Sequence, residues 1–432
     1  MTSLNTLNAP KKDINQAILE AREQRYQRIQ NHLDTAESVP VILKSITPGK
    51  HKQIPMSRIH VKLIHHLIMK VFKPLSASYE QSLDGDYYMY TYKTSPQKIK
   101  KRMVFIEKHH PLGRFIDIDV YTKTKAVSRT DLGLSPRKCI LCDKPAHVCA
   151  RSKNHSQKAL LEHMHQKTKE TVIKAIKKEA LKALRRELYL HPKFGLVSRK
   201  SSGIHTMDYT HFLASIEALD PYFQQYLEVD IDQPESLKQL RSIGINAEKA
   251  MLEATGGHNT HKGIIFIFGL ILPYYLKHIL HQNSFTVMLE DIKKAAQQLT
   301  KHDFENLNNK TELSHGEKVY LTYGIKGIRG EVSEGFPSIM GWYKKYPYND
   351  YQKLCAIMSR LDDTTIIKRK NLGTLKTIKQ EMQALLEERT WIQNYYETLS
   401  EQYLKNNISP GGAADLLAVT FFFEATDYLF SN

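Results

Sequence analysis

Gly256-Gly257-His258-Asn259-Thr260-His261-Lys262-Gly263 leads directly into the apolar run Ile264 to Leu276, and this junction decides the fold of the second half of the chain. Paired glycines let the backbone approach a ligand closely. The free N–H groups at a helix start, with a lysine and a histidine beside them, attract anions such as phosphate. The spacing differs from a Walker A loop, which has four residues between its first glycine and Gly-Lys-Ser/Thr. The run that follows is apolar on all sides, which predicts a buried core helix that begins at an anion-binding loop.

Further helical patterns lie on both sides of this junction. They cover Asp208 to Leu219, Pro234 to Ala254, Lys262 to His281, Val287 to Leu299, Asn349 to Arg360, Thr374 to Asn406 and Ala413 to Tyr428. The motifs rich in glycine and polar residues fall between these helices, where helix ends supply unpaired N–H groups and loops supply side chains. We expect an all-α domain with a polar site at its helix ends.

The first part of the chain has a different pattern. A helix is predicted from Asp13 to His32, and short β-prone runs follow at Val41 to Ile46, Tyr87 to Tyr92, Met103 to Ile106 and Phe115 to Tyr121. We expect an α+β domain with a small mixed sheet. A helical run from His155 to Tyr189 contains the expected join near Gln166, which predicts domains at residues 1–166 and 167–432.

Length and composition agree with two globular domains. The 432 residues exceed the roughly 250–300 that one core usually serves. Hydrophobic residues make up 41% and charged residues 25%, as in soluble globular proteins. The polar start, Met1 to Lys12, differs from a signal peptide, and no apolar run reaches the roughly 18 residues of a membrane span. We expect a cytoplasmic protein without a membrane partner, whose four cysteines are reduced.

The net charge of +17 predicts a surface that attracts anions, with basic residues concentrated from Lys167 to Lys200. Nucleic acid is the usual partner of so basic a protein, but zinc-finger, RNP and basic-zipper patterns are missing and aromatic residues are not interleaved with the basic run. Polyphosphate substrates account for the charge, as does a solvated helix surface. We therefore expect no nucleic-acid partner, and keep a nucleic-acid-binding protein as the alternative.

The stretch Thr255 to Gly263 resembles the central motif of the triphosphoribosyl-dephospho-CoA synthases, which build the precursor of the citrate lyase prosthetic group. Four further stretches match that family in order. They are His191 to Val197 with Gly203-Ile204-His205 and Met207-Asp208; Gly327 to Glu331 with Gly335-Phe336-Pro337; Leu361-Asp362-Asp363-Thr364; and Ser409 to Leu417. The second half of the chain thus resembles a synthase through five motifs in the family's order.

Upstream, Gly113-Arg114-Phe115-Ile116-Asp117-Ile118-Asp119-Val120 and the cysteine-containing stretches that follow resemble the apo-citrate lyase phosphoribosyl-dephospho-CoA transferase. The two enzymes catalyse consecutive steps of one pathway. The resemblance implies a bifunctional fusion, with a transferase in residues 1–166 and a synthase in residues 167–432. A second enzyme hypothesis keeps only the synthase active, or gives the first domain a different carrier protein.

Asp117 and Asp119 alternate on a predicted strand, so both carboxylates project from one face and are able to share a Mg²⁺ ion. Such a metal suits nucleotidyltransferase-like chemistry, because it neutralises phosphates and activates an attacking oxygen. The resemblance implies that a serine of the acyl carrier (gamma) subunit of citrate lyase attacks the α-phosphate and releases pyrophosphate. Arg114 is the candidate for binding phosphate. A solvated strand face and a surface salt bridge are the alternatives for these residues.

The pattern Cys139-x2-Cys142-x6-Cys149-x5-His155 has the ligand types of a Cys₃His zinc site, and its first spacing is the usual one in zinc knuckles. The other spacings are irregular. Reduced cysteines also often pack in cores, so a structural role without Zn²⁺ is the alternative.

The resemblance implies that the synthase joins the 2′-hydroxyl of 3′-dephospho-CoA to C1′ of the ATP ribose and expels adenine. This chemistry requires a general base, a donor for the leaving adenine, and cations for the triphosphate. The candidates for catalysis are Glu248, His261, Asp362, Asp363 and Asp415, with Asp362 and Asp363 also as Mg²⁺ ligands. Candidates for binding substrate are Lys193, Arg199, His205, Gly256, Gly257, Asn259, Lys262, Arg329, Arg369, Gly411 and Gly412. Helix capping is the alternative role for Asp362 and Asp415, and ordinary surface charge for the cations.

Overall fold

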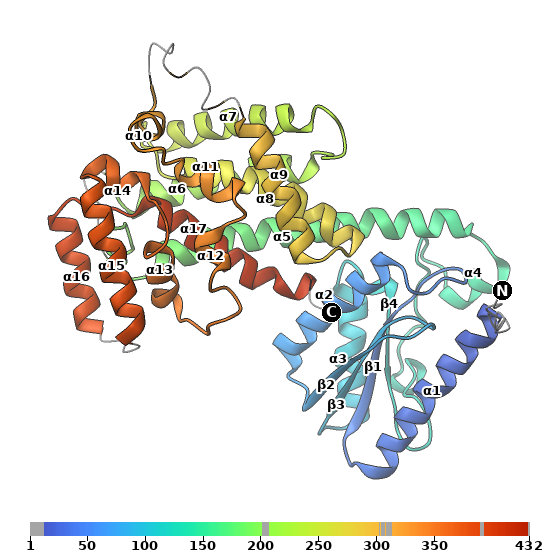
Figure 1. Cartoon of the computed structure of the whole chain (residues 1–432). Helices are drawn as coiled ribbons and strands as arrows, with labels where there is room; N and C mark the ends of the chain where they lie inside the picture. Colours follow the sequence, from blue (N-terminus) through green and yellow to red (C-terminus); the bar gives the residue numbers. More distant parts are fainter. Residues whose placement is uncertain are drawn as a thin grey trace, which may run out of the picture. The chain divides into compact units, whose positions relative to one another are not determined.

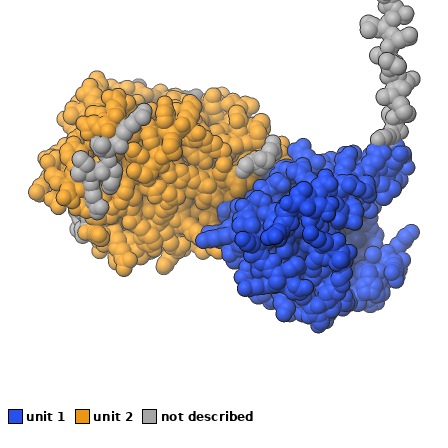
Figure 2. Space-filling view, turned by 90° about the horizontal axis from the view of Figure 1, so that it is seen from below, with its two compact units in different colours: residues 1–172 blue, residues 173–432 orange. Residues whose placement is uncertain are grey.

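The computed structural model describes residues 13–200, 207–301, 303, 307, 313–388 and 393–430. It forms two compact units, residues 1–172 and 173–432 (Figure 2). The division lies inside the long helix α5 (Gln157–Tyr189), which also contains Gln166, the expected boundary.

The first unit is built on a four-stranded sheet of order β2-β3-β1-β4. Its strands are β1 (Val39–Ser45), β2 (Ser76–Glu80), β3 (Tyr87–Tyr92) and β4 (Ile116–Val120). All three pairings are antiparallel, so the expected mixed sheet is wrong in this detail. Helix α2 (Pro55–Phe72) joins β1 to β2, and α3 (Pro96–His109) joins β3 to β4. Each helix joins strands that have another strand between them, which is the βαββαβ arrangement of ferredoxin-like folds.

Helices cover both faces of this sheet (Figure 1). On one face α2 and α3 pack against a core that contains Val41, Tyr90 and Ile118. On the other face α1 (Ile14–Thr35) packs through Ile29 and Leu33 against the strands. Asp119 pairs with Ile42 in the β1–β4 register, and Ile42 belongs to the α1-side core. Because paired residues point to the same face, Asp117 and Asp119 lie on the α1 side of the sheet.

The prediction of a strand at Met103 to Ile106 is wrong, because these residues lie in α3. Ser95 caps this helix by accepting a hydrogen bond from the Lys98 N–H, and Pro96 occupies its first turn. The buried residues Ile99, Met103 and Ile106 then recur at helical spacing against the sheet. Helical periodicity and capping therefore outweigh the β-propensity of one short run.

Polar side chains saturate the outer edge of β4. The Ile118 N–H donates to Glu107 Oε1 at 3.1 Å, and Lys100 Nζ donates to the Ile118 carbonyl at 2.6 Å. Arg137 donates to the Ile116 carbonyl. These bonds occupy backbone groups that would otherwise be open to a further strand, so the sheet ends at β4.

Among the described residues of the second unit, the regular secondary structure is helical, as predicted. After α5 its helices are α6 (Tyr209–Glu228), α7 (Ser236–Ala254), α8 (Lys262–His281), α9 (Phe285–Thr300), α10 (His315–Tyr323), α11 (Gly327–Ser333), α12 (Pro337–Met340), α13 (Asp350–Met358), α14 (Thr364–Arg369), α15 (Leu372–Glu388), α16 (Gln393–Lys405) and α17 (Gly411–Thr426). Asp208 caps α6 by accepting from the N–H groups of Thr210 and His211. This contact gives Asp208 a structural role at the start of α6.

Helix α8 is the central helix of this unit and packs against α6, α7, α9 and α17 (Figure 1). Its bounds are those predicted from the apolar run. By length and hydropathy α8 is able to span a membrane, which corrects the expectation that no segment passes this test. However, 72% of the apolar window is buried within the protein. Such burial is typical of a core helix.

The prediction of one continuous helix from Thr374 to Asn406 is wrong. Helix α15 ends at Glu388 and α16 begins at Gln393. The hydroxyl of Tyr403 in α16 donates to Glu381 Oε2 in α15 at 2.5 Å. In a single straight helix these residues would be about 33 Å apart, so the two helices lie side by side. Helical propensity in two neighbouring segments does not reveal where one helix ends and the next begins.

Candidate active sites

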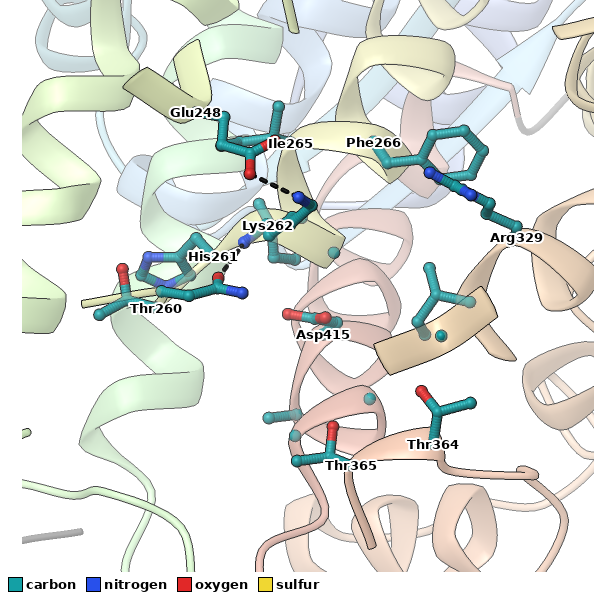
Figure 3. Close-up of a pocket in the computed structure, with 18 of the residues that line it drawn as sticks. Glu248, Thr260, His261, Lys262, Ile265, Phe266, Arg329, Thr364, Thr365 and Asp415 are labelled. Carbon is teal, nitrogen blue, oxygen red and sulfur yellow. Dashed lines mark hydrogen bonds and ion pairs between the residues drawn. The ribbon is translucent and has the colours of Figure 1, made fainter. Parts of the chain in front are cut away.

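The second unit contains a cavity of about 790 Å³ at the ends of α7, α8, α11, α14 and α17. Figure 3 shows Asp415 between the first turn of α8 and the threonines at the start of α14. The cavity is lined by as many carboxylates as cations. The carboxylates are Glu187, Glu248, Asp303, Asp362, Asp363 and Asp415; the cations are Arg241, Lys262, Lys326, Arg329, Lys368 and Arg369. A polyanionic ligand with a divalent cation suits this mixture of charges.

The loop before α8 turns sharply into the cavity. Gly256 and Gly257 have φ angles of +62° and +88°, which glycine adopts without strain. The Asn259 side chain accepts a hydrogen bond from the Lys262 N–H at 3.2 Å. The N-cap residue His261 makes no side-chain cap. The first turn of α8, including Gly263 and Ile264, therefore lines the cavity with the positive end of its helix dipole.

His261 and Lys262 occupy different environments at this helix start. His261 is buried, and its Nδ1 lies 2.7 Å from Ser215 Oγ on α6. Burial, with a smaller contribution from Lys193, lowers the pKa of His261 to about 3. Lys262 is exposed and forms an ion pair of 2.5 Å with Glu248. At neutral pH His261 is therefore an uncharged imidazole, and Lys262 supplies the positive charge.

Asp415 lies in the first turns of α17 and lines the cavity. Among the described residues, none forms a hydrogen bond or ion pair with its carboxylate. Burial raises the pKa of Asp415 well above its usual range, and the charges of Glu187 and Asp363 raise it further. Because it lies within α17, the capping role considered for Asp415 does not apply. An unpaired carboxylate with a raised pKa is a typical general base.

Asp362 and Asp363 make different contacts. Asp363 is buried and is the N-cap of α14, accepting from the Thr365 N–H at 2.8 Å. Its second oxygen accepts from the Ala413 N–H of α17 at 3.0 Å. Burial raises the pKa of Asp363, although these hydrogen bonds oppose the shift. Asp362 is exposed and forms an ion pair with Lys379 at 2.8 Å. The helix-capping role considered for Asp362 therefore belongs to Asp363.

Two glycines at the start of α17 allow this close packing. A β-carbon at Gly412 would lie 3.2 Å from Asp363 Oδ2, and one at Gly411 would lie 3.1 Å from Thr365 Oγ1. Both positions contact α14, which also carries Arg369. The Arg369 guanidinium donates to Asn407 Oδ1 at 3.1 Å and lines the cavity. The motif from Ser409 to Leu417 thus brings the starts of α14 and α17 together at one wall of the cavity.

The structure brings most of the predicted synthase residues to the cavity. Those that line it are Glu248, Gly257, Asn259, His261, Lys262, Arg329, Asp362, Asp363, Arg369, Gly411, Gly412 and Asp415. Gly256 shapes the adjacent turn, and His205 lies outside the described residues. Arg199 is exposed and is not part of the cavity lining. Lys193 is buried against Glu187 in an ion pair of 2.6 Å, so it neutralises that carboxylate.

Several cavity residues were not predicted from the sequence. Lys326 directly precedes the Gly327 motif and Lys368 directly precedes the predicted Arg369, and this proximity is a signal that could have found them. Arg241 and His315 belong to helices without a motif, and only the fold brings them to the cavity. Sequence motifs therefore mark the backbone turns of the site better than its cations.

In the first unit Asp117 and Asp119 lie on one face of β4, and both residues are partly buried. Asp117 Oδ1 accepts from Arg137 at 3.0 Å. Burial raises the pKa of Asp119 to about 6, and the neighbouring Asp117 carboxylate adds to this effect. The two side chains are thus coupled carboxylates on one surface, an arrangement that suits a divalent cation.

Asp84 is a buried acid that was not predicted. Its carboxylate accepts from Arg22 at 2.8 Å, Arg25 at 2.5 Å and Lys44 at 2.6 Å. Burial alone would raise its pKa, but hydrogen bonds from Lys44, Arg25 and Arg22 lower the pKa of Asp84 to about 2. Arg25 therefore belongs to an ion-pair cluster on the α1 side of the sheet.

Comparison with known proteins agrees with this division of the chain. A family model described as ATP:dephospho-CoA triphosphoribosyl transferase matches residues 173–432. Another, described as apo-citrate lyase phosphoribosyl-dephospho-CoA transferase, matches residues 14–171. Protein CitXG of Leuconostoc mesenteroides subsp. cremoris is 31% identical over 94% of this chain and 95% of its own length. The chain belongs to the CitXG family.

Other relatives are similar to one or both units. Protein CitXG of Haemophilus influenzae is 28% identical over 94% of this chain and 95% of its own length. The probable 2-(5''-triphosphoribosyl)-3'-dephosphocoenzyme-A synthase of Streptococcus mutans is 37% identical over 58% of this chain and 95% of its own length. The second unit of this CitXG family member thus corresponds to a separate enzyme in another organism.

Proposed function

We propose that the chain is a bifunctional transferase that makes the prosthetic group of citrate lyase and attaches it to the acyl carrier (gamma) subunit. The observation that carries this proposal for the second unit is the Asp415 carboxylate, which has no partner among the described residues and lies beside the first turn of α8, in a cavity lined by equal numbers of carboxylates and cations. Membership of the CitXG family supports both activities. We expect the enzyme to act in the cytoplasm, where its nucleotide substrates occur.

In the second unit, Asp415 acts as the general base for the 2′-hydroxyl of 3′-dephospho-CoA. The freed oxygen attacks C1′ of the ATP ribose and the C1′–N bond breaks. Adenine leaves with the bonding electrons and takes up one proton, which balances the proton that Asp415 accepts from the hydroxyl. The triphosphate stays on the ribose and binds the first turn of α8 together with Lys262, Arg329 and Arg369. His261 is uncharged, so it acts through a neutral hydrogen bond and not as an imidazolium acid.

A magnesium ion bound here would neutralise charge on the triphosphate. Asp362 fits as its ligand because it is exposed and only one of its oxygens is paired with Lys379. Asp363 fits less well, since both of its oxygens accept backbone N–H groups. We therefore assign Asp363 to the ordering of α14 and α17.

In the first unit, Asp117 and Asp119 would hold Mg²⁺, which would neutralise charge on the phosphates of the intermediate. A serine hydroxyl of the acyl carrier subunit attacks the α-phosphate, and pyrophosphate leaves. Arg137 holds Asp117 in position through their hydrogen bond. We expected Arg114 to bind phosphate. Its guanidinium donates instead to two backbone carbonyls of the cysteine-containing turn, so we assign it no role in substrate binding.

Mass spectrometry of the full chain with ATP, Mg²⁺ and 3′-dephospho-CoA tests the synthase. Free adenine and a triphosphoribosyl adduct are expected, and ADP with phosphate as the only products would refute this assignment. Addition of apo carrier subunit then tests the transferase through the mass of the carrier. Adenine release without carrier labelling would favour the hypothesis that only the synthase is active. Salt-dependent binding of nucleic acid without adenine release would favour the nucleic-acid alternative.

A further inference from the structure

Four potential metal ligands come together in the segment between β4 and α5. They are Cys139, Cys142, Cys149 and His155, and their ligand atoms all lie within 4.8 Å of one another. Cys142 Sγ is 3.5 Å from Cys149 Sγ and 3.4 Å from His155 Nε2. In a tetrahedral zinc site with Zn–S bonds of about 2.3 Å, sulfur atoms lie about 3.8 Å apart. The cysteines are free thiols, so the cluster is not a disulfide.

The backbone of this segment has a compact turn that presents the ligands. The Cys139 N–H donates to the Lys144 carbonyl at 2.8 Å, and the Ala146 N–H donates to the Arg137 carbonyl at 2.8 Å. These bonds close the turn that carries Cys139 and Cys142. Cys149 follows on α4 (Ala146–Ser152), and His155 lies just beyond that helix. Turn, helix and loop thus contribute ligands to one point.

The same segment has almost no hydrophobic core of its own. From residue 128 to residue 163, the buried residues are Cys139 and Cys149 alone. A segment of this kind has little apolar burial to offset the entropy of ordering its backbone. A bound metal ion supplies the missing free energy in many small folded modules.

We propose that Cys139, Cys142, Cys149 and His155 bind one structural Zn²⁺ ion. Three thiolates and one imidazole favour zinc over magnesium or calcium, which prefer oxygen ligands. The four protein ligands fill a tetrahedral shell and leave no position for a substrate. The role of the ion is therefore to hold this segment together.

Hydrogen bonds connect the zinc segment to the proposed transferase site. Arg114, just before β4, donates to the carbonyls of Cys139 at 3.3 Å and Cys142 at 3.4 Å. In the other direction, Arg137 is two residues before Cys139 and donates to Asp117 at 3.0 Å and to Glu107 at 2.7 Å. If the proposed function holds, the zinc ion keeps the Arg137 guanidinium hydrogen-bonded to Asp117. Arg137 is then a positioning residue for the Asp117 carboxylate.

Metal analysis of the purified full chain tests the proposal directly. After removal of loosely bound metal and incubation with zinc, we expect one zinc ion per chain by mass spectrometry. Cys142→Ser and Cys149→Ser should each lower the zinc content below about a tenth of that value. Cys355→Ala is the matched control, because Cys355 is buried in α13, outside the cluster, and should keep the ion. A wild-type chain without zinc, or zinc fully retained in both serine variants, would overturn the proposal.

Cobalt substitution covers the case in which the serine variants do not fold. The unmodified chain loaded with Co²⁺ should give the intense visible bands and thiolate charge-transfer absorption of a tetrahedral cobalt site. A weak octahedral spectrum would contradict the proposal. Neither readout depends on activity, so the zinc site and the proposed function fail or succeed separately. In the zinc-depleted chain, carrier labelling should be lost and adenine release retained.

Discussion

The carboxylate of Asp415 in α17 lies directly against the backbone of Gly263 in α8, so that a β-carbon at position 263 would come within 1.9 Å of Asp415 Oδ2. Two motifs separated by about 150 residues of sequence therefore meet at a single contact. The contact explains why the first turn of α8 contains a glycine, since a β-carbon at this position would force the Asp415 carboxylate to shift.

Gly263→Ala tests this contact. The substitution should lower adenine release at least about a hundredfold, because a displacement of about 1 Å at a catalytic group has an effect of that size. Secondary structure, measured by circular dichroism, should be unchanged, since alanine suits a helix better than glycine. Gly373→Ala in α15 is the control, outside the cavity, and should keep full activity. Equal activities of the two variants would remove the argument for Asp415.

Asp415→Asn should lower the rate of adenine release by about 10²- to 10⁴-fold, the usual contribution of a general base. Carrier labelling from pre-formed intermediate should be unaffected, because that reaction belongs to the other unit. A loss of both activities in a folded variant would instead point to a structural role.

The same substitution should stabilise the second unit at neutral pH. Burial raises the pKa of Asp415 in the folded protein, so between its unfolded value of about 4 and its raised value the folded state holds more protons than the unfolded state. Stability is therefore lost as pH rises through this range. Thermal unfolding should show Asp415→Asn more stable than wild type at pH 7 and equal to it below about pH 4. A lower melting temperature at pH 7 would contradict the proposed burial cost.

Carrier labelling should depend on the ionisation of Asp119, whose pKa is raised to about 6. If the carboxylate must be ionised to hold Mg²⁺, the rate should fall about tenfold for each pH unit below that value. Asp117→Asn removes one cause of the raised pKa and should move the midpoint to lower pH in the activity that remains. Adenine release by the same samples is the internal control. If the pH midpoint of carrier labelling does not move in Asp117→Asn, the two carboxylates do not interact.

Asp84→Asn should destabilise the first unit by about 3–5 kcal/mol, because it leaves the side chains of Arg25 and Lys44 without a counter-charge in a partly buried site. Hydrogen exchange should become faster in β1 and β3, while α8 and α17 keep their protection. Stability from Asp84 should also be lost as pH falls from about 4 towards its folded pKa of about 2. Unchanged exchange in β1 would mean that the cluster contributes little.

Much of the candidate synthase site could be predicted from the sequence. Its motifs are turns, and turns require glycine or capping residues at particular positions: Gly257 has a positive φ and Asp363 caps α14. Such requirements are local, so they remain readable without the fold. Arg241 and His315 carry no local signal, and only packing brings them to the cavity.

The same distinction applies to the first unit. The alternation of Asp117 and Asp119 on a strand could be predicted, since side chains two residues apart share a face. The cluster around Asp84 could not, because its partners come from α1 and β1, as many as 62 residues away. Ion pairs of this kind depend on which elements become neighbours.

By itself the sequence determined the helical class of the second unit, the bounds of α8, the α+β class of the first unit and the order of the motifs, because periodicity, capping and glycine turns act over a few residues. Only the tertiary structure decided that the sheet is antiparallel, that α15 and α16 lie side by side, and that Asp363 is a cap while Asp415 faces the cavity without a partner among the described residues. The physical reason is that strand direction, burial and the partner of a charged group are set by contacts between distant segments, and those contacts form only when the whole unit packs.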